Sequence, residues 1–149
     1  MKKIVLIIIF IILPLSLSYS QVTQATIGVD GFTCSLCAKG VEEQFRAMDF
    51  VKSVKTDLKK ATFTIVFKNN SKINIGMLKD GVEDGGFTLR DIVIKAEGTF
   101  ENNKLITGNT PDLTLKNMTG NYSNGDKISI SGNVSLSDNA VKVKQVKKI

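Results

Sequence analysis

The sequence predicts an α+β fold in which a β-α-β-β-α-β domain is followed by a small all-β module. Three observations lead to this prediction. Two segments carry apolar residues at helical spacing, several others alternate apolar and polar residues as strands do, and no helical spacing continues beyond Gly98. A chain of 149 residues has room for one ordinary domain or two small ones.

Residues 1–20 have the pattern of a secretory signal peptide. Two lysines precede an apolar run at residues 4–15, and Ser18 and Ser20 stand at the small-residue positions of a cleavage site. The run is too short to span a bilayer comfortably, which makes an uncleaved anchor the less favoured alternative. We therefore expect cleavage of the signal, a periplasmic or secreted location, and no membrane span in the mature chain.

The first helix is predicted directly after a strand-like stretch at residues 25–32. Residues 36–48 place Val41, Phe45 and Met48 at i, i+4 and i+7, which is one face of an amphipathic helix. We expect this face to pack on a sheet, with Met48 as part of the core rather than as a metal ligand.

Three further strands are predicted around a second helix. Residues 50–58 and 61–68 alternate like two strands joined by a turn at Lys59 and Lys60, and residues 87–96 are the third strand. The second helix is predicted over 73–86, where apolar residues share one face and two glycines end the helix. This element order matches the ferredoxin-like split β-α-β motif. Its expected apolar face is formed by Ile75, Leu78 and Val82, and Met77 is also expected in the core.

The remainder, residues 98–149, consists of short alternating runs interrupted by turn residues. Strands are predicted at 113–118, 127–136 and 140–149. A module of this size is marginally stable alone, so we expect it to pack on the first domain or to close as a small barrel, and it weakly resembles an OB-like barrel. The predicted division is therefore a signal at 1–20, a first domain at 21–97 and a β-rich module at 98–149. Turns are predicted at Asn103, Asn109, Gly125 and Asn139.

Charge and composition exclude several classes of function. The chain carries a net charge of +6, which falls to +4 without the two signal lysines, and the excess is too mild for a nucleic-acid footprint. Near the C-terminus the lysines alternate with valines, as on the solvated face of a strand. There is no histidine, and we find no general acid–base pair, nucleophile triad or phosphate-binding loop. We expect a binding protein rather than an enzyme.

The stretch "GFTCSLC" holds the only two cysteines, Cys34 and Cys37. Cys34 is expected in the first strand–helix loop and Cys37 at the start of the helix, where unpaired N–H groups favour thiolates. Two convergent thiolates without a harder ligand suit a soft ion of low coordination number, namely Cu(I), Hg(II) or Ag(I). Cys34 and Cys37 are therefore the predicted metal ligands.

Three alternatives compete with this interpretation. Structural zinc needs four ligands, and this chain has no third cysteine and no histidine, so Zn(II) would require a second chain or carboxylates. Thiol–disulfide exchange also uses C-x-x-C, but Thr33 replaces the usual preceding aromatic residue and no proline lies between Pro14 and Pro111. A purely structural disulfide would close a very short loop and contribute little stability.

The segment "GFTCSLCAKGVEEQF" resembles the G-M-T-C-x-x-C loop of heavy-metal-associated domains, which occur in copper chaperones, copper-transporting ATPases and periplasmic mercury-binding proteins. The resemblance extends over residues 25–96 and includes "VEDGGF", which resembles the segment that ends the second helix in the family. Gly31, Thr33, Cys34 and Cys37 fall on the motif. Residues at family core positions are Val41, Phe45, Val51, Val54 and Leu58.

This resemblance implies an exported protein that binds Cu(I), or else Hg(II), Ag(I) or Zn(II), for transfer or sequestration. It implies a metal-donor or acceptor partner such as a metal-transporting ATPase or another chaperone.

Phe32 replaces the family's usual methionine, and Phe87 stands where copper chaperones often carry a lysine. Lys59 and Lys60 are expected at the same end of the sheet, where they either supply positive charge or are merely solvated. Interaction through the C-terminal module is a further alternative.

Overall fold

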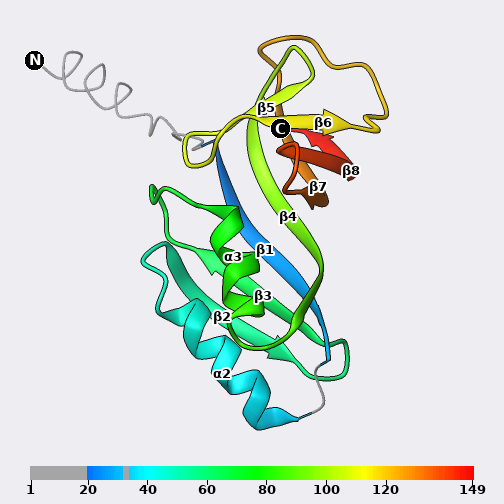
Figure 1. Cartoon of the computed structure of the whole chain (residues 1–149). Coiled ribbons are helices and arrows are strands. Elements are labelled where there is room, and N and C mark those ends of the chain that lie inside the picture. Colours follow the sequence, from blue (N-terminus) through cyan, green and yellow to red (C-terminus); the bar gives the residue numbers. More distant parts are fainter. Residues whose placement is uncertain (1–19, 32–33) are drawn as a thin grey trace, which may run out of the picture.

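The computed structural model describes residues 20–31 and 34–149. In its first part, helices α2 and α3 lie against one side of a sheet, and the C-terminal strands gather at the far end of the long strand β4 (Figure 1). The elements of this first part are β1 (Gln21–Asp30), α2 (Ser35–Arg46), β2 (Val51–Asp57), β3 (Thr62–Phe67), α3 (Ile75–Glu83) and β4 (Thr88–Glu101).

The first part has the predicted β-α-β-β-α-β order and the ferredoxin-like arrangement. Its strands pair in the order β2-β3-β1-β4, and all three pairings are antiparallel. In β3, residues alternate between the helix-covered face and the open face, so every second side chain is buried. Phe45 of α2 meets Phe63 of β3 edge to face, with ring centroids 5.3 Å apart. The buried helix residues include the predicted Val41, Phe45, Leu78 and Val82.

The C-terminal strands close into a ring with the second half of β4. Strand β4 pairs with β5 and β7, β5 with β6, β6 with β8, and β8 with β7. Among the strand pairs of the described residues, β6 and β8 alone run parallel. The boundary predicted between residues 97 and 98 falls inside β4, and the division into domains stays a prediction. The added strands are β5 (Lys104–Ile106), β6 (Leu113–Lys116), β7 (Lys127–Ser135) and β8 (Ala140–Lys148).

A loop of the ring clamps the start of β1. The Asn109 side chain accepts a hydrogen bond from the Val22 N–H at 2.9 Å and donates one to the Val22 carbonyl at 3.0 Å. The Ile73 N–H donates to the Asn109 carbonyl at 2.7 Å, and the Gly108 N–H donates to the Ser20 carbonyl. The β5–β6 loop therefore ties the ring both to β1 and to the segment before α3.

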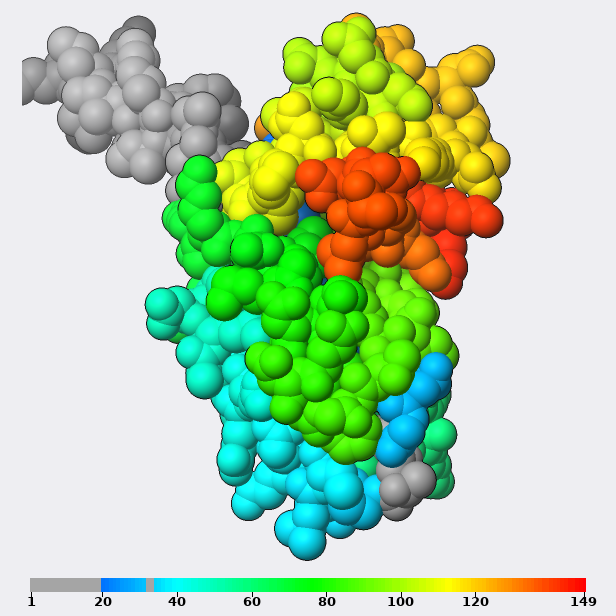
Figure 2. All heavy atoms as spheres, in the orientation of Figure 1, coloured from blue at the N-terminus to red at the C-terminus, as the bar shows by residue number. Residues whose placement is uncertain are grey.

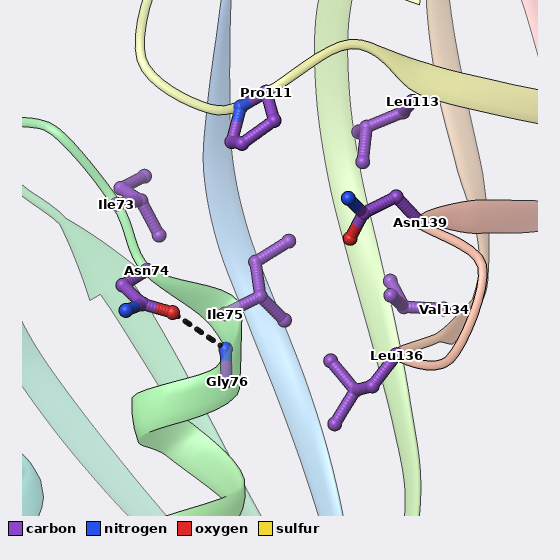
Figure 3. A pocket seen from close by; sticks show the side chains of 9 residues that line it. All are labelled: Ile73, Asn74, Ile75, Gly76, Pro111, Leu113, Val134, Leu136 and Asn139. Atoms are coloured by element: carbon purple, nitrogen blue, oxygen red, sulfur yellow. Dashed lines mark hydrogen bonds between the residues drawn. The ribbon is translucent and has the colours of Figure 1, made fainter.

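Beside this clamp, α3 approaches the turn between β7 and β8. Figure 2 shows the orange atoms of this turn next to the green atoms of α3. A cavity of about 480 Å³ lies between them, and Ile75, Val134, Leu136 and Asn139 are among the side chains that line it (Figure 3). The two parts of the chain thus meet along side chains as well as through β4.

Three predictions about single elements are wrong or incomplete. Leu58 is 52% exposed, because it follows the last residue of β2 in a turn beyond the packed faces. Met77 is 41% exposed, since Leu78 takes the inward position of α3; Met48 is half-buried and packs against the core as expected. The sequence patterns did not predict β5 or the extension of β4 beyond residue 96.

The predicted signal at residues 1–20 lies outside the described residues except for Ser20, and so do Phe32 and Thr33 of the cysteine motif. Within residues 20–31 and 34–149, no helix is long and apolar enough to cross a membrane.

Candidate metal centre

The cysteine loop connects the end of β1 to the start of α2. Gly31 has a φ of +88°, a left-handed conformation that favours glycine, and the chain changes direction there. Cys34 is the N-cap of α2, with extended backbone angles, and its Sγ accepts a hydrogen bond from the Cys37 N–H at 3.1 Å. The Cys34 carbonyl accepts from the Ala38 N–H at 3.2 Å and begins the helical ladder. A sulfur atom thus takes the place of the usual capping oxygen.

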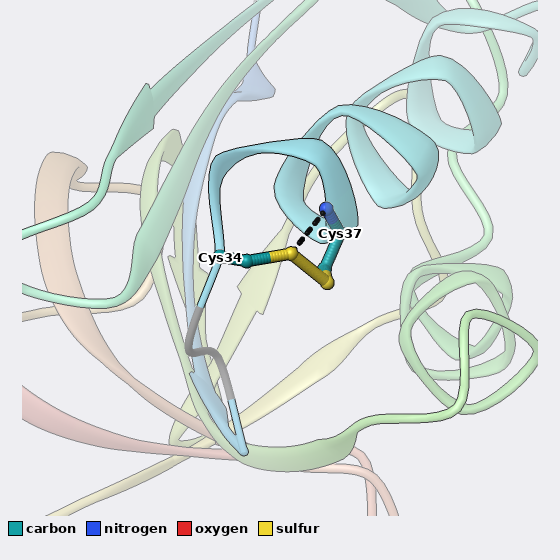
Figure 4. The surroundings of a disulfide bond; sticks show 2 residues. All are labelled: Cys34 and Cys37. Carbon is teal, nitrogen blue, oxygen red and sulfur yellow. Dashed lines mark hydrogen bonds between the residues drawn. A yellow bond between two sulfur atoms is a disulfide. The ribbon is translucent and has the colours of Figure 1, made fainter.

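The two sulfur atoms meet at the helix N-terminus, as the C-x-x-C spacing predicts. Cys34 and Cys37 form a disulfide with their Cα atoms 5.4 Å apart (Figure 4). Cys34 is exposed, whereas Cys37, one turn into the helix, is half-buried. A disulfide has no thiolate to offer a metal. The same placement after two-electron reduction leaves two neighbouring thiols beside unpaired helix N–H groups, which favour the thiolate form.

The segment that follows α3 packs against this loop. The Phe87 ring lies against Gly31, because a Cβ atom at residue 31 would stand 3.6 Å from it. The same ring also approaches Gly85, and a Cβ there would come within 2.6 Å of Val41. Gly86 has a φ of +83° and ends the helix in the left-handed conformation. The predicted segment "VEDGGF" therefore positions an aromatic ring beneath the cysteine loop.

The β2–β3 turn with Lys59 and Lys60 lies at this end of the sheet, as predicted. The Val29 N–H, near the end of β1, donates to the Ala61 carbonyl at 3.0 Å. Both lysines are exposed, and neither forms an ion pair with any residue that the structure describes. Their role in offsetting the charge of a bis-thiolate complex stays a prediction.

Arg90 was not identified from the sequence, although it connects three segments at this end of the sheet. Its guanidinium lies 3.3 Å from the Asp30 carboxylate and donates to the Lys60 carbonyl at 3.3 Å. All of these groups are largely exposed, so the pairs contribute little stability individually. They do connect the start of β4 with the end of β1 and the β2–β3 turn.

Glu42 anchors α2 to β2. Its carboxylate accepts hydrogen bonds from the Thr56 hydroxyl at 2.6 Å and from the Arg46 guanidinium at 2.7 Å. Arg46 also donates to the Val54 carbonyl at 3.1 Å. The Thr56 hydrogen bond, followed by the Arg46 hydrogen bond, lowers the pKa of Glu42 below its usual value of 4.5. This network fixes the helix whose N-terminus carries the cysteines.

The described residues contain no group of three or more histidine, cysteine or carboxylate side chains that could hold a metal. A two-sulfur site remains, and that donor set fits a soft ion which accepts low coordination.

The first part of the chain is similar to known proteins. The model of the heavy-metal-associated domain matches residues 26–88. Copper chaperone CopZ of Staphylococcus aureus, from strain MRSA252, is 28% identical over 65 residues, which cover 44% of this chain and 94% of that protein. The protein of strain Newman matches with the same figures.

Two solved structures are also similar. The CopZ metallochaperone is 25% identical, covers 46% of this chain and 100% of its own, and has a TM-score of 0.43. A copper binding domain from HMA7, a P-type ATPase, is 26% identical, covers 46% of this chain and 90% of its own, and has a TM-score of 0.42. The similarity is thus confined to the first part of the chain, where residues 26–88 match the model of the heavy-metal-associated domain.

Proposed function

We propose that this protein is exported and holds a Cu(I) ion between the Sγ atoms of Cys34 and Cys37. The observation that carries the proposal is the convergence of these two sulfurs at the N-terminus of α2, inside a heavy-metal-associated domain. The domain's relatives include proteins named copper chaperones, which favours copper over Hg(II), Ag(I) or Zn(II).

The site supports transfer better than permanent storage. Cys34 is exposed and Leu36, between the two cysteines, is 80% exposed, so an incoming thiolate has direct access to the ion. A partner thiolate would add to the two-coordinate ion, and Cys34 or Cys37 would then leave as a thiolate. The partner is accordingly a protein with soft sulfur ligands of its own, such as a metal-transporting ATPase or another chaperone.

The test is anaerobic Cu(I) competition against a chromophoric chelator. We expect the reduced mature protein to bind one Cu(I) tightly, and the Cys34→Ser/Cys37→Ser variant and the disulfide form to lose that binding. Binding by the wild type that is no stronger than binding by the double variant would refute the proposal. N-terminal sequencing of the protein from the periplasm or medium tests export separately.

The disulfide favours a second candidate function, thiol–disulfide exchange. An external thiolate would attack the exposed Cys34 Sγ, and Cys37 would leave as a thiolate. This function predicts an oxidising reduction potential and no tight metal binding. A titration of the disulfide against a glutathione redox buffer distinguishes the two.

We also propose that the C-terminal strands form an OB-like barrel. The support is their order around the ring, β4-β5-β6-β8-β7, with the single parallel pair β6–β8. Five strands also form the partly open Greek-key barrel of OB folds. The assignment rests on architecture and implies no ligand.

A further inference from the structure

The outer surface of β4, β7 and β8 carries a shallow trough that the copper site does not use. Residues on the three strands stand in register: Lys95 opposite Ser131 and Ser131 opposite Gln145, and in the next row Ser129 opposite Lys147. These five residues, together with Ile130 and Val146, line one hollow of about 240 Å³, which we call the lysine–serine trough. Its position on the ring separates it from the cysteine loop.

The trough has its shape because its central strand carries small side chains. Ser129 and Ser131 are half-buried on β7, while the longer Lys95 and Lys147 rise from the two flanking strands. Strands ordinarily favour β-branched or aromatic residues at such positions. The smaller serine side chains leave a depression between the two flanking strands. The inward neighbours Ala96 and Ile130 are buried and hold the strands in place.

The hydrogen-bonding groups of the trough are available to a ligand. In the described part of the chain, neither Lys95 nor Lys147 forms an ion pair, and the side-chain hydroxyls of Ser129 and Ser131 make no hydrogen bond. Glu97 stands opposite Ser129 in the pairing register but does not line the hollow. Lys144 lies at the bulge of β8 and adds positive charge at the edge.

We infer that the lysine–serine trough binds a tetrahedral oxyanion, a phosphate group either free or carried on a lipid headgroup. Two ammonium groups and two hydroxyls can donate to several oxygens of one such anion, and charge-assisted hydrogen bonds are the stronger kind. The hollow is smaller than pockets that enclose drug-sized ligands, which suits a single headgroup. Because the trough is open to solvent, its affinity falls as salt concentration rises.

The test is an NMR titration of the mature protein, disulfide intact, with inorganic phosphate at low ionic strength. We expect saturable shifts of the Ser129, Ser131 and Lys147 amides. Lys95→Gln/Lys147→Gln should weaken binding by about tenfold or more, equivalent to about 1.4 kcal/mol. Lys68→Gln/Lys72→Gln removes the same charge from exposed lysines elsewhere and should change the dissociation constant by less than about twofold, since distant surface charges are screened.

Two further measurements make the outcome decisive. Ser129→Ala/Ser131→Ala keeps both lysines, so weaker phosphate binding in this variant separates a built site from a merely cationic surface. Co-sedimentation with phosphatidylglycerol–phosphatidylcholine vesicles, compared with pure phosphatidylcholine vesicles, identifies a lipid headgroup if pelleting is lost in Lys95→Gln/Lys147→Gln. Two results would overturn the inference if vesicle binding is also absent. One is a set of phosphate-induced shifts that never saturates. The other is a set of shifts that remains unchanged in both the lysine variant and the serine variant of the trough.

Discussion

Asn109 is hydrogen-bonded to both backbone groups of Val22, although 87 residues separate them in the sequence. The amide of Asn109 thereby takes the place of a strand neighbour at the start of β1. It is only 4% exposed, so its polar atoms need these partners. This side chain thus links the ring of C-terminal strands to the domain that carries the cysteines.

Replacing Asn109 with alanine should destabilise the whole protein. The change removes two buried hydrogen bonds and leaves the Val22 N–H and carbonyl without partners, which costs about 2–4 kcal/mol of the free energy of unfolding. Urea denaturation measures this loss. Asn121→Ala is the matched control, because Asn121 is exposed and makes no side-chain hydrogen bond within the described residues, so its unfolding midpoint should stay near that of the wild type.

Alanine at Gly31 and at Gly40 should have opposite effects. Gly31 has a φ of +88°, where alanine is strained by about 1–2 kcal/mol. Gly40 lies within α2, and a Cβ there would meet nothing within 4 Å, so alanine should stabilise the helix by about 1 kcal/mol. Chemical denaturation of the two variants checks the pair. Equal effects of the two substitutions would contradict the assigned conformation of the loop.

Glu42 should make stability depend on pH in the acid range. Its pKa in the folded protein is lowered, first by the Thr56 hydrogen bond and then by Arg46. Because the pKa is lowered on folding, the ionised Glu42 carboxylate contributes fully to stability above its unfolded-state pKa near 4.5. This stabilisation is lost as pH falls through the lower pKa of the folded state. The stability gap between the wild type and Glu42→Gln should therefore narrow as pH falls below about 4.5.

The control for this measurement is Glu43→Gln. Glu43 is exposed, and its carboxylate makes no hydrogen bond or ion pair in the part of the chain that the structure describes. Thermal unfolding of the wild type and both variants between acid and neutral pH measures the difference in stability. We expect this difference from the wild type to narrow at acid pH for Glu42→Gln and not for Glu43→Gln. A gap that stays constant across this range would show that the carboxylate does not anchor α2 as described.

The first part of the fold could be predicted because its signals are local. Apolar spacing locates α2 and α3, alternation locates the strands, and "VEDGGF" indicates the end of the second helix. Cys34 and Cys37 lie side by side, since three residues of helix bring position 37 back beside position 34, and their role as metal ligands stays a prediction.

What could not be predicted depends on contacts between distant segments. Asparagine is common in turns, and the sequence predicts Asn109 as a turn residue. Nothing nearby in the sequence indicates that it forms hydrogen bonds with Val22. Leu58 is apolar and follows a strand, so alternation alone cannot tell that the strand ends at Asp57. The ring closes through pairing of β4 with β7, a long-range register that local periodicity does not contain. The disulfide depends on the redox state of the cysteines rather than on their spacing.

The most direct test of the copper assignment is X-ray absorption spectroscopy at the copper edge on the one-to-one Cu(I) complex of the reduced protein. We predict that two sulfur atoms coordinate the copper in the wild type, and that nitrogen or oxygen scatterers appear in Cys34→Ser and in Cys37→Ser. A first shell of nitrogen or oxygen in the wild type, or a spectrum that neither substitution changes, would contradict the claim that Cys34 and Cys37 together hold the ion.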